Sequence, residues 1–240
     1  MTAYDTIHRA ILDGVADRDV PRWAAGVVGE VASGGSGIMA VRHPLGFYCL
    51  PVERTGERGV CVHLWSDRLT PARPTTSATH AHSWELVSFV LCGTLCNELV
   101  TVKDSPVSPV SPDSPDGPTH RVFEVISTAD GDEIRRTPRL VRRRTRAAEL
   151  HHSGEVYSLP AGVFHETTHR GETATVALGR GFPDAVDLVL GAPDTETHRT
   201  RRHVCGRDET IHAASLVVDL LAEVPRPRHE EHDRCERRRP

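Results

Sequence analysis

The 240-residue sequence predicts a mainly β protein, a sandwich or a barrel with helices at its N-terminus and a short helix near its C-terminus. Helical hydrophobic patterns are confined to the two ends of the chain. Between them, short runs rich in Val, Leu, Phe and Thr are separated by Gly or Pro. So many short strands at close spacing are typical of a sandwich or a barrel.

Residues 1–37 are expected to form a helical segment that packs on the outside of the β region. Ile7, Ile11 and Val15 recur about once per helical turn, and a second helical stretch follows Pro21. A Gly-rich run then ends the pattern before the first predicted strand.

Residues 38–200 are expected to form the β domain. The predicted strands are 38–42, 47–52, 59–65, 84–92, 94–102, 119–126, 139–142, 155–159, 163–168, 173–179 and 186–190. The interval 103–118 is rich in Pro and Ser, which predicts a mobile surface loop. Seven arginines lie within 135–146, where a solvated face is favoured over an anion-attracting rim.

The C-terminal part contains a predicted helix and a predicted disordered tail. The helix falls within 201–224 and carries apolar residues from Ile211 to Leu221. The tail, 225–240, is charged and contains proline, so we expect it to be disordered.

Composition argues against several classes of partner. The net charge of −4 provides no general attraction to nucleic acid or to anionic membranes. No apolar run approaches the roughly 20 residues that cross a bilayer, and the N-terminus lacks the apolar block of a signal peptide. The sequence therefore predicts a cytoplasmic protein with free or buried thiols and a small-molecule partner.

Two segments carry residues suited to metal binding. His80 and His82 are two apart, so in a strand they project from one face. His165 follows a Pro160–Gly162 turn and is the candidate for a third imidazole. Imidazole nitrogens suit several divalent metals, including Zn, Fe, Ni, Cu and Mn.

Both segments resemble the two signature motifs of the cupin superfamily. The second motif matches from Gly154 through Pro160 and Gly162 to His165, and the first matches at its His-x-His pair. The resemblance covers roughly 38–190 and implies a cupin or jelly-roll β-barrel. It also implies one divalent metal ion inside that barrel and makes a homodimer the expected assembly.

The sequence departs from the first motif at its glutamate. Glu85 follows His82 by three positions, an odd step that points a regular strand side chain away from the metal. A β-bulge could turn it back, so Glu85 stays a candidate ligand or outer-sphere group. His169 stands where the second motif has Asn and is the other such candidate. A three-histidine site is favoured, which is similar to the thiol dioxygenase branch of cupins.

The resemblance favours an Fe(II)-dependent dioxygenase of a small molecule, with Zn, Ni or Mn as alternative ions. The other hypotheses are a non-redox metal-dependent isomerase, lyase or hydrolase, and a cupin that binds a small ligand without turnover. His63 alternates with Cys61 and Trp65 in one strand, and Tyr157 precedes the turn. Both are candidate catalytic residues, with ordinary core packing as the alternative role.

Overall fold

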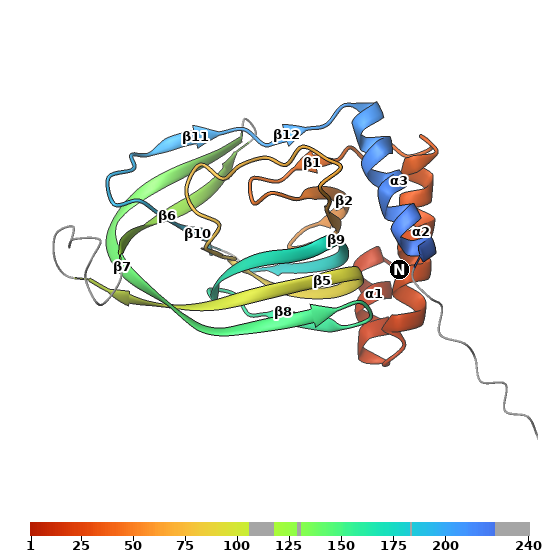
Figure 1. Ribbon diagram of the computed structural model, residues 1–240, viewed down its shortest axis with the longest axis horizontal. Helices are drawn as coiled ribbons and strands as arrows, with labels where there is room; N and C mark the ends of the chain where they lie inside the picture. The colour runs from red at the N-terminus through yellow and green to blue at the C-terminus, as the bar shows by residue number, and fades with distance from the viewer. Residues whose placement is uncertain (106–117, 129–130, 183, 224–240) are drawn as a thin grey trace, which may run out of the picture.

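The computed structural model describes residues 1–105, 118–128, 131–182 and 184–223. Its three helices gather at one end of the molecule, and the strands extend away from them (Figure 1). The helices are α1 (Ala3–Leu12), α2 (Ala16–Ala32) and α3 (Arg207–Glu223). The sequence prediction of N-terminal helices, a mainly β centre and one C-terminal helix is confirmed. None of the helices in these ranges is long and apolar enough to cross a bilayer.

The break between the first two helices lies earlier than the sequence predicts. The Thr2 hydroxyl caps α1 by accepting a hydrogen bond from the Asp5 amide at 3.1 Å. Gly14 then adopts a φ of +69°, a conformation that glycine reaches without steric cost, and ends α1. Pro21 lies inside α2 instead of before it.

Twelve strands are described. They are β1 (Val41–Arg42), β2 (Tyr48–Thr55), β3 (Arg58–Trp65), β4 (His80–Ala81), β5 (Trp84–Asp104), β6 (Thr119–Thr128), β7 (Gly131–His152), β8 (Val156–Leu159), β9 (Phe164–Gly181), β10 (Asp187–Gly191), β11 (His198–Thr200) and β12 (His203–Val204).

Six of these strands close into a ring. The order β9–β4–β10–β6–β7–β5 returns to β9 through the β5–β9 pairing, and every pair is antiparallel. The strands β3, β2, β1 and β12 extend the sheet from β9, and β8 pairs with β5. The closed sheet confirms the predicted β-barrel.

Long bent strands replace two pairs of short predicted ones. The predicted strands 84–92 and 94–102 are one strand, β5, which bends with β9 at Gly93. Gly93 has a φ of +80°, and a Cβ there would lie 2.4 Å from the Glu172 carbonyl oxygen. Only glycine allows the strands to approach this closely. The Pro/Ser-rich loop and the tail fall largely outside the described residues, at 106–117 and 224–240.

The Arg-rich stretch is a strand far longer than the predicted 139–142. It forms much of β7, which pairs with both β5 and β6. Most of its arginines are exposed, and Arg139 pairs with Asp104 at 2.8 Å. Cross-strand pairing on both sides stabilises this strand despite its low apolar content.

The strand alternation separates an outer core from an inner one. Val60, Val62 and Leu64 of β3 pack with the buried faces of the helices. Trp65 belongs to a second cluster, which also contains Leu86, Val90, Leu95, Tyr157 and Leu159. Because the helices cover the outer face, this second cluster and its neighbours on the same face line the barrel interior.

Candidate metal centre

Three imidazoles converge where β4 meets the start of β9. His80 lies directly opposite His165 in the β4–β9 pair. The Nε2 atoms of His80 and His82 are 3.3 Å apart. One ligand nitrogen from each of the three histidines lies within 4.8 Å of the other two. The predicted convergence of two distant sequence segments is therefore present.

A turn connects the second segment directly to the first. The Gly162 amide donates a hydrogen bond to the His82 carbonyl oxygen at 2.8 Å. Gly162 has a φ of +78°, which favours glycine, and Pro160 fixes the backbone two residues earlier. This turn leads the chain into β9 with the His165 side chain directed at the other two rings.

Backbone carbonyls orient two of the three rings. His80 Nδ1 lies 2.9 Å from the Ala78 carbonyl oxygen, and His165 Nδ1 lies 3.0 Å from that of Val163. A carbonyl oxygen only accepts hydrogen bonds, so each Nδ1 carries the proton. Each Nε2 then has a free lone pair, the arrangement that metal-binding histidines commonly adopt.

Burial keeps the imidazoles neutral. Desolvation, followed by the nearby His165, lowers the pKa of His80 to about 3. Burial and the two neighbouring rings hold the pKa of His82 well below its usual value. Burial also lowers the pKa of His165. Neutral imidazole is the metal-binding form, so protons compete weakly for this site near neutral pH.

Trp84 supports the His82 ring from inside the barrel. The two ring centroids are 4.0 Å apart at an interplanar angle of 30°. The indole lies over Gly179, where an added Cβ would come within 3.1 Å of the Trp84 ring. The missing side chain at Gly179 therefore leaves the space that Trp84 occupies.

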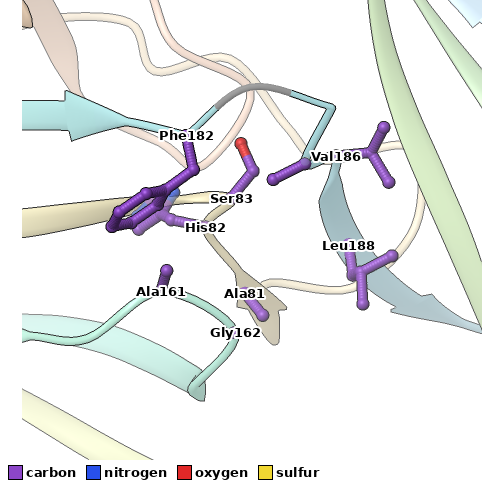
Figure 2. A pocket seen from close by; sticks show the side chains of 9 residues that line it. Ala81, His82, Ser83, Ala161, Gly162, Phe182, Val186 and Leu188 are labelled. Carbon is purple, nitrogen blue, oxygen red and sulfur yellow. The ribbon is translucent and has the colours of Figure 1, made fainter. Parts of the chain in front are cut away.

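An apolar pocket of about 340 Å³ opens beside His82 (Figure 2). Ala161, Phe182, Val186 and Leu188 contribute side chains to its lining. Ser83 also lines the pocket, but its hydroxyl donates to Asp187 at 2.8 Å. The site can therefore accept a small apolar group close to one of the three imidazoles.

The two candidate additional ligands lie elsewhere. Glu85 pairs with Arg180 at 3.0 Å and lines a surface pocket beside α1. It does not belong to the three-imidazole cluster. His169 is four residues beyond His165 on β9, about 13 Å along an extended strand. Its Nδ1 lies 2.9 Å from the Gly171 carbonyl oxygen.

The two candidate catalytic residues are also outside the cluster. Tyr157 is buried, and its ring stacks on His151 at a centroid distance of 4.4 Å. His63 packs against Phe47 at 4.5 Å and Trp65 at 5.9 Å. Their catalytic roles stay predictions.

Sequence reasoning missed the residues that position the cluster from its outer side. Thr79 precedes His80, and its hydroxyl donates to the Glu166 carboxylate at 2.9 Å. Arg143 also pairs with Glu166, at 3.1 Å. The signal was their place in the sequence, because Thr79 and Glu166 are direct neighbours of His80 and His165.

Comparison with known proteins finds similarity only among solved structures. No family model and no curated protein sequence matches the chain. The solved structures that it resembles include cupins. An RmlC-like cupin from Shewanella frigidimarina is 12% identical, with 62% of this chain and 89% of that chain covered, at a TM-score of 0.34.

Two enzymes are among the other similar structures. A hydroquinone 1,2-dioxygenase from a Sphingomonas species is 15% identical, covering 56% of this chain and 66% of that one, at a TM-score of 0.33. A DMSP lyase from Ruegeria pomeroyi is 16% identical, covering 63% and 54%, at a TM-score of 0.30. Likeness at these TM-scores carries no argument about activity, so the metal site stands on the chain's own geometry.

Proposed function

We propose that the protein is a metal-dependent enzyme that holds one Fe(II) ion with His80, His82 and His165 and acts as a dioxygenase on a small molecule. The observation that carries the proposal is the convergence of three neutral imidazoles, two of them with Nδ1 bonded to a backbone carbonyl. An Fe(II) ion held by three nitrogen ligands keeps positions open for substrate and O₂ and supplies the redox chemistry.

The chain's own residues would bind and orient the substrate. The pocket lined by Ala161, Phe182 and Leu188 would hold its apolar part beside His82. Phe182 and Val186 are each 43% exposed, so the outer part of this lining can be reached from solvent. Because the Ser83 hydroxyl is already bonded to Asp187, this wall favours an apolar group.

Metal content tests the binding part of the proposal. Wild-type protein and the His82→Ala variant are loaded with Fe(II) under reducing, anaerobic conditions, and bound iron is measured. We expect one equivalent less in His82→Ala, and no loss in the matched variant Glu85→Gln. Equal iron content in wild type and His82→Ala would contradict the site.

The oxygen-activating part needs a separate measurement. Nitric oxide serves as an O₂ analogue, and Fe(II)-loaded wild type should give the half-integer-spin electron paramagnetic resonance signal of an iron–nitrosyl centre. The signal should be absent from His82→Ala. A site that takes only Zn²⁺ and gives no nitrosyl signal would instead support a Lewis-acid lyase, isomerase or hydrolase.

A further inference from the structure

A second group of metal-ligating side chains lies on β2 and β3. Cys49, Cys61 and His63 each offer one ligand atom, and all three atoms lie within 4.8 Å of one another. None of them belongs to the three-imidazole cluster. In that cluster His80 lies on β4, His82 is the residue after β4, and His165 lies on β9.

The strand register explains why these side chains meet. Cys49 lies directly opposite His63 in the antiparallel β2–β3 pair, and Cys61 is two residues from His63 on the same face. Val60, Val62 and Leu64 occupy the other face and pack toward the helices. The Cys49, Cys61 and His63 side chains therefore point into the barrel.

The surroundings restrict access of water to the group. Cys49 is 7% exposed, Cys61 and His63 are half-buried, and the His63 ring packs against Phe47 and Trp65. Phe47 in turn stacks on His43 at a centroid distance of 4.3 Å. One buried thiol, Cys49, and one half-buried thiol, Cys61, lie beside the imidazole, so bulk solvent solvates a charge on this group less than it solvates an exposed cysteine.

Of the two thiols in this group, Cys61 differs from the other cysteines, whereas the hydrogen bond to Cys61 and burial raise the pKa of Cys49. Burial raises the pKa of Cys92 and of Cys205 to about 11, as expected for inert thiols. By contrast, the hydrogen bond from Cys49, followed by that from His63, lowers the pKa of Cys61 against the effect of burial. Thiolate is the form that binds metal.

We propose that Cys49, Cys61 and His63 form a second metal site that binds Zn²⁺. Two thiolates and a neutral imidazole neutralise a divalent ion, which suits a location that is largely removed from solvent. Tetrahedral zinc with Zn–S bonds of about 2.3 Å places two sulfurs about 3.8 Å apart, so the ligand atoms need to close by no more than about 1 Å. Each thiol that still carries a proton releases it to solvent when its sulfur binds the ion.

Cobalt(II) is the probe, because thiolate ligands give it a near-ultraviolet charge-transfer absorption that imidazoles do not. The experiment uses the full chain with a phosphine reductant. It is done in the His82→Ala background, which removes one ligand of the three-imidazole cluster. We expect one equivalent of Co²⁺ to bind with that absorption, and Zn²⁺ to displace it. Additional Cys61→Ser should abolish the absorption, whereas the matched control Cys96→Ser should keep it.

The absence of a charge-transfer band in His82→Ala, or a band that survives both Cys61→Ser and Cys49→Ser, would overturn the proposal. If a serine variant fails to fold by circular dichroism, protection of thiols is measured on otherwise unmodified protein. Zn²⁺ should then shield two more thiols from maleimide than a metal-free sample does, and equal labelling would reject the site. These results do not depend on the first cluster, so the two metal proposals can fail separately.

Discussion

The hydroxyl of Thr79 donates a hydrogen bond to the carboxylate of Glu166 at 2.9 Å. Thr79 is the residue before β4, and Glu166 belongs to β9. The contact therefore joins the two segments directly beside His80 and His165. Arg143 of β7 reaches the same carboxylate at 3.1 Å and so brings a third strand to it. One arginine of the Arg-rich stretch therefore braces the metal centre, while Arg135, Arg136, Arg139, Arg144 and Arg146 are exposed.

Removing the Thr79 hydroxyl should weaken metal binding more than it weakens the fold. In Thr79→Val the buried side chain keeps its volume but no longer bonds to Glu166, so His80 and His165 lose part of their mutual positioning. Loss of a supporting contact of this kind lowers metal affinity by roughly tenfold. Competition with a chromophoric chelator measures the affinity.

The matched control is Thr101→Val, which removes an exposed hydroxyl that donates to the Arg144 carbonyl oxygen at 3.2 Å. It should bind metal as wild type does. Wild-type affinity in Thr79→Val, with or without a change in melting temperature, would show that the contact does not position the ligands.

Gly179→Ala should displace Trp84 and, through it, His82. The added methyl would lie 3.1 Å from the Trp84 ring, which must move by a few tenths of an ångström while it still contacts the His82 ring. Overpacking of this kind costs about 1–3 kcal/mol, and we expect metal affinity to fall with it. Urea unfolding and metal titration measure the two effects.

Gly26→Ala provides the matched control for Gly179→Ala. Gly26 is exposed in α2, and an added Cβ there meets nothing within 4 Å. Alanine in a helix interior is favoured over glycine by about 1 kcal/mol, so this variant should be more stable with unchanged metal affinity. A stable Gly179→Ala protein with normal affinity would contradict the proposed support of His82 by Trp84.

The stability of the fold should depend on pH through Glu209 of α3. Its carboxylate accepts hydrogen bonds from Arg42 at 2.6 Å and Tyr48 at 2.7 Å, which ties α3 to β1 and β2. The bond from Arg42, supported by that from Tyr48, lowers the pKa of Glu209 from 4.5 to about 2. Because the folded pKa lies below the unfolded one, this stabilisation is present above pH 4.5 and is lost as the pH falls toward 2.

Glu209→Gln should therefore lower the free energy of unfolding at pH 7 by on the order of 2 kcal/mol and flatten its decline below pH 4.5. Some decline should persist, because Arg68 and Ser66 lower the pKa of Glu172 to about 2 in the same way. The exposed Glu57→Gln is the control and should follow the wild-type curve. A Glu209→Gln curve parallel to wild type would refute the assignment.

The barrel and the three-imidazole cluster were predictable because their signals in the sequence are local. The His80–His82 spacing and the turn before His165 each occupy one short segment, although β4 ends at Ala81 and His82 is the residue after it. β7 was largely missed because its Arg-rich sequence lacks an apolar face. It is stabilised by pairing with β5 and β6, which no local pattern reports.

The group formed by Cys49, Cys61 and His63 illustrates a different limit. The shared face of Cys61 and His63 follows from alternation within one strand, but Cys49 joins them through the β2–β3 register. That register includes an irregularity between Pro51 and Glu53, which sequence periodicity does not reveal. Likewise, the ion pair of Glu85 with Arg180 depends on the pairing of β5 with β9.

The last prediction concerns the apolar pocket beside His82. Ala161 lies in the turn before His165 and its side chain lines the pocket, so Ala161→Phe should fill part of the 340 Å³ space without removing a metal ligand. Fluorobenzene is a suitable apolar probe, because a paramagnetic ion at the three imidazoles broadens its fluorine resonance when it binds nearby. With Fe(II)-loaded wild type we expect such broadening, and with Ala161→Phe we expect it to fall several-fold at equal iron content. Ala148→Phe, on an exposed position of β7, should behave as wild type does. Undiminished broadening in Ala161→Phe would mean that apolar molecules reach the metal by another route, and the pocket would then have no part in substrate binding.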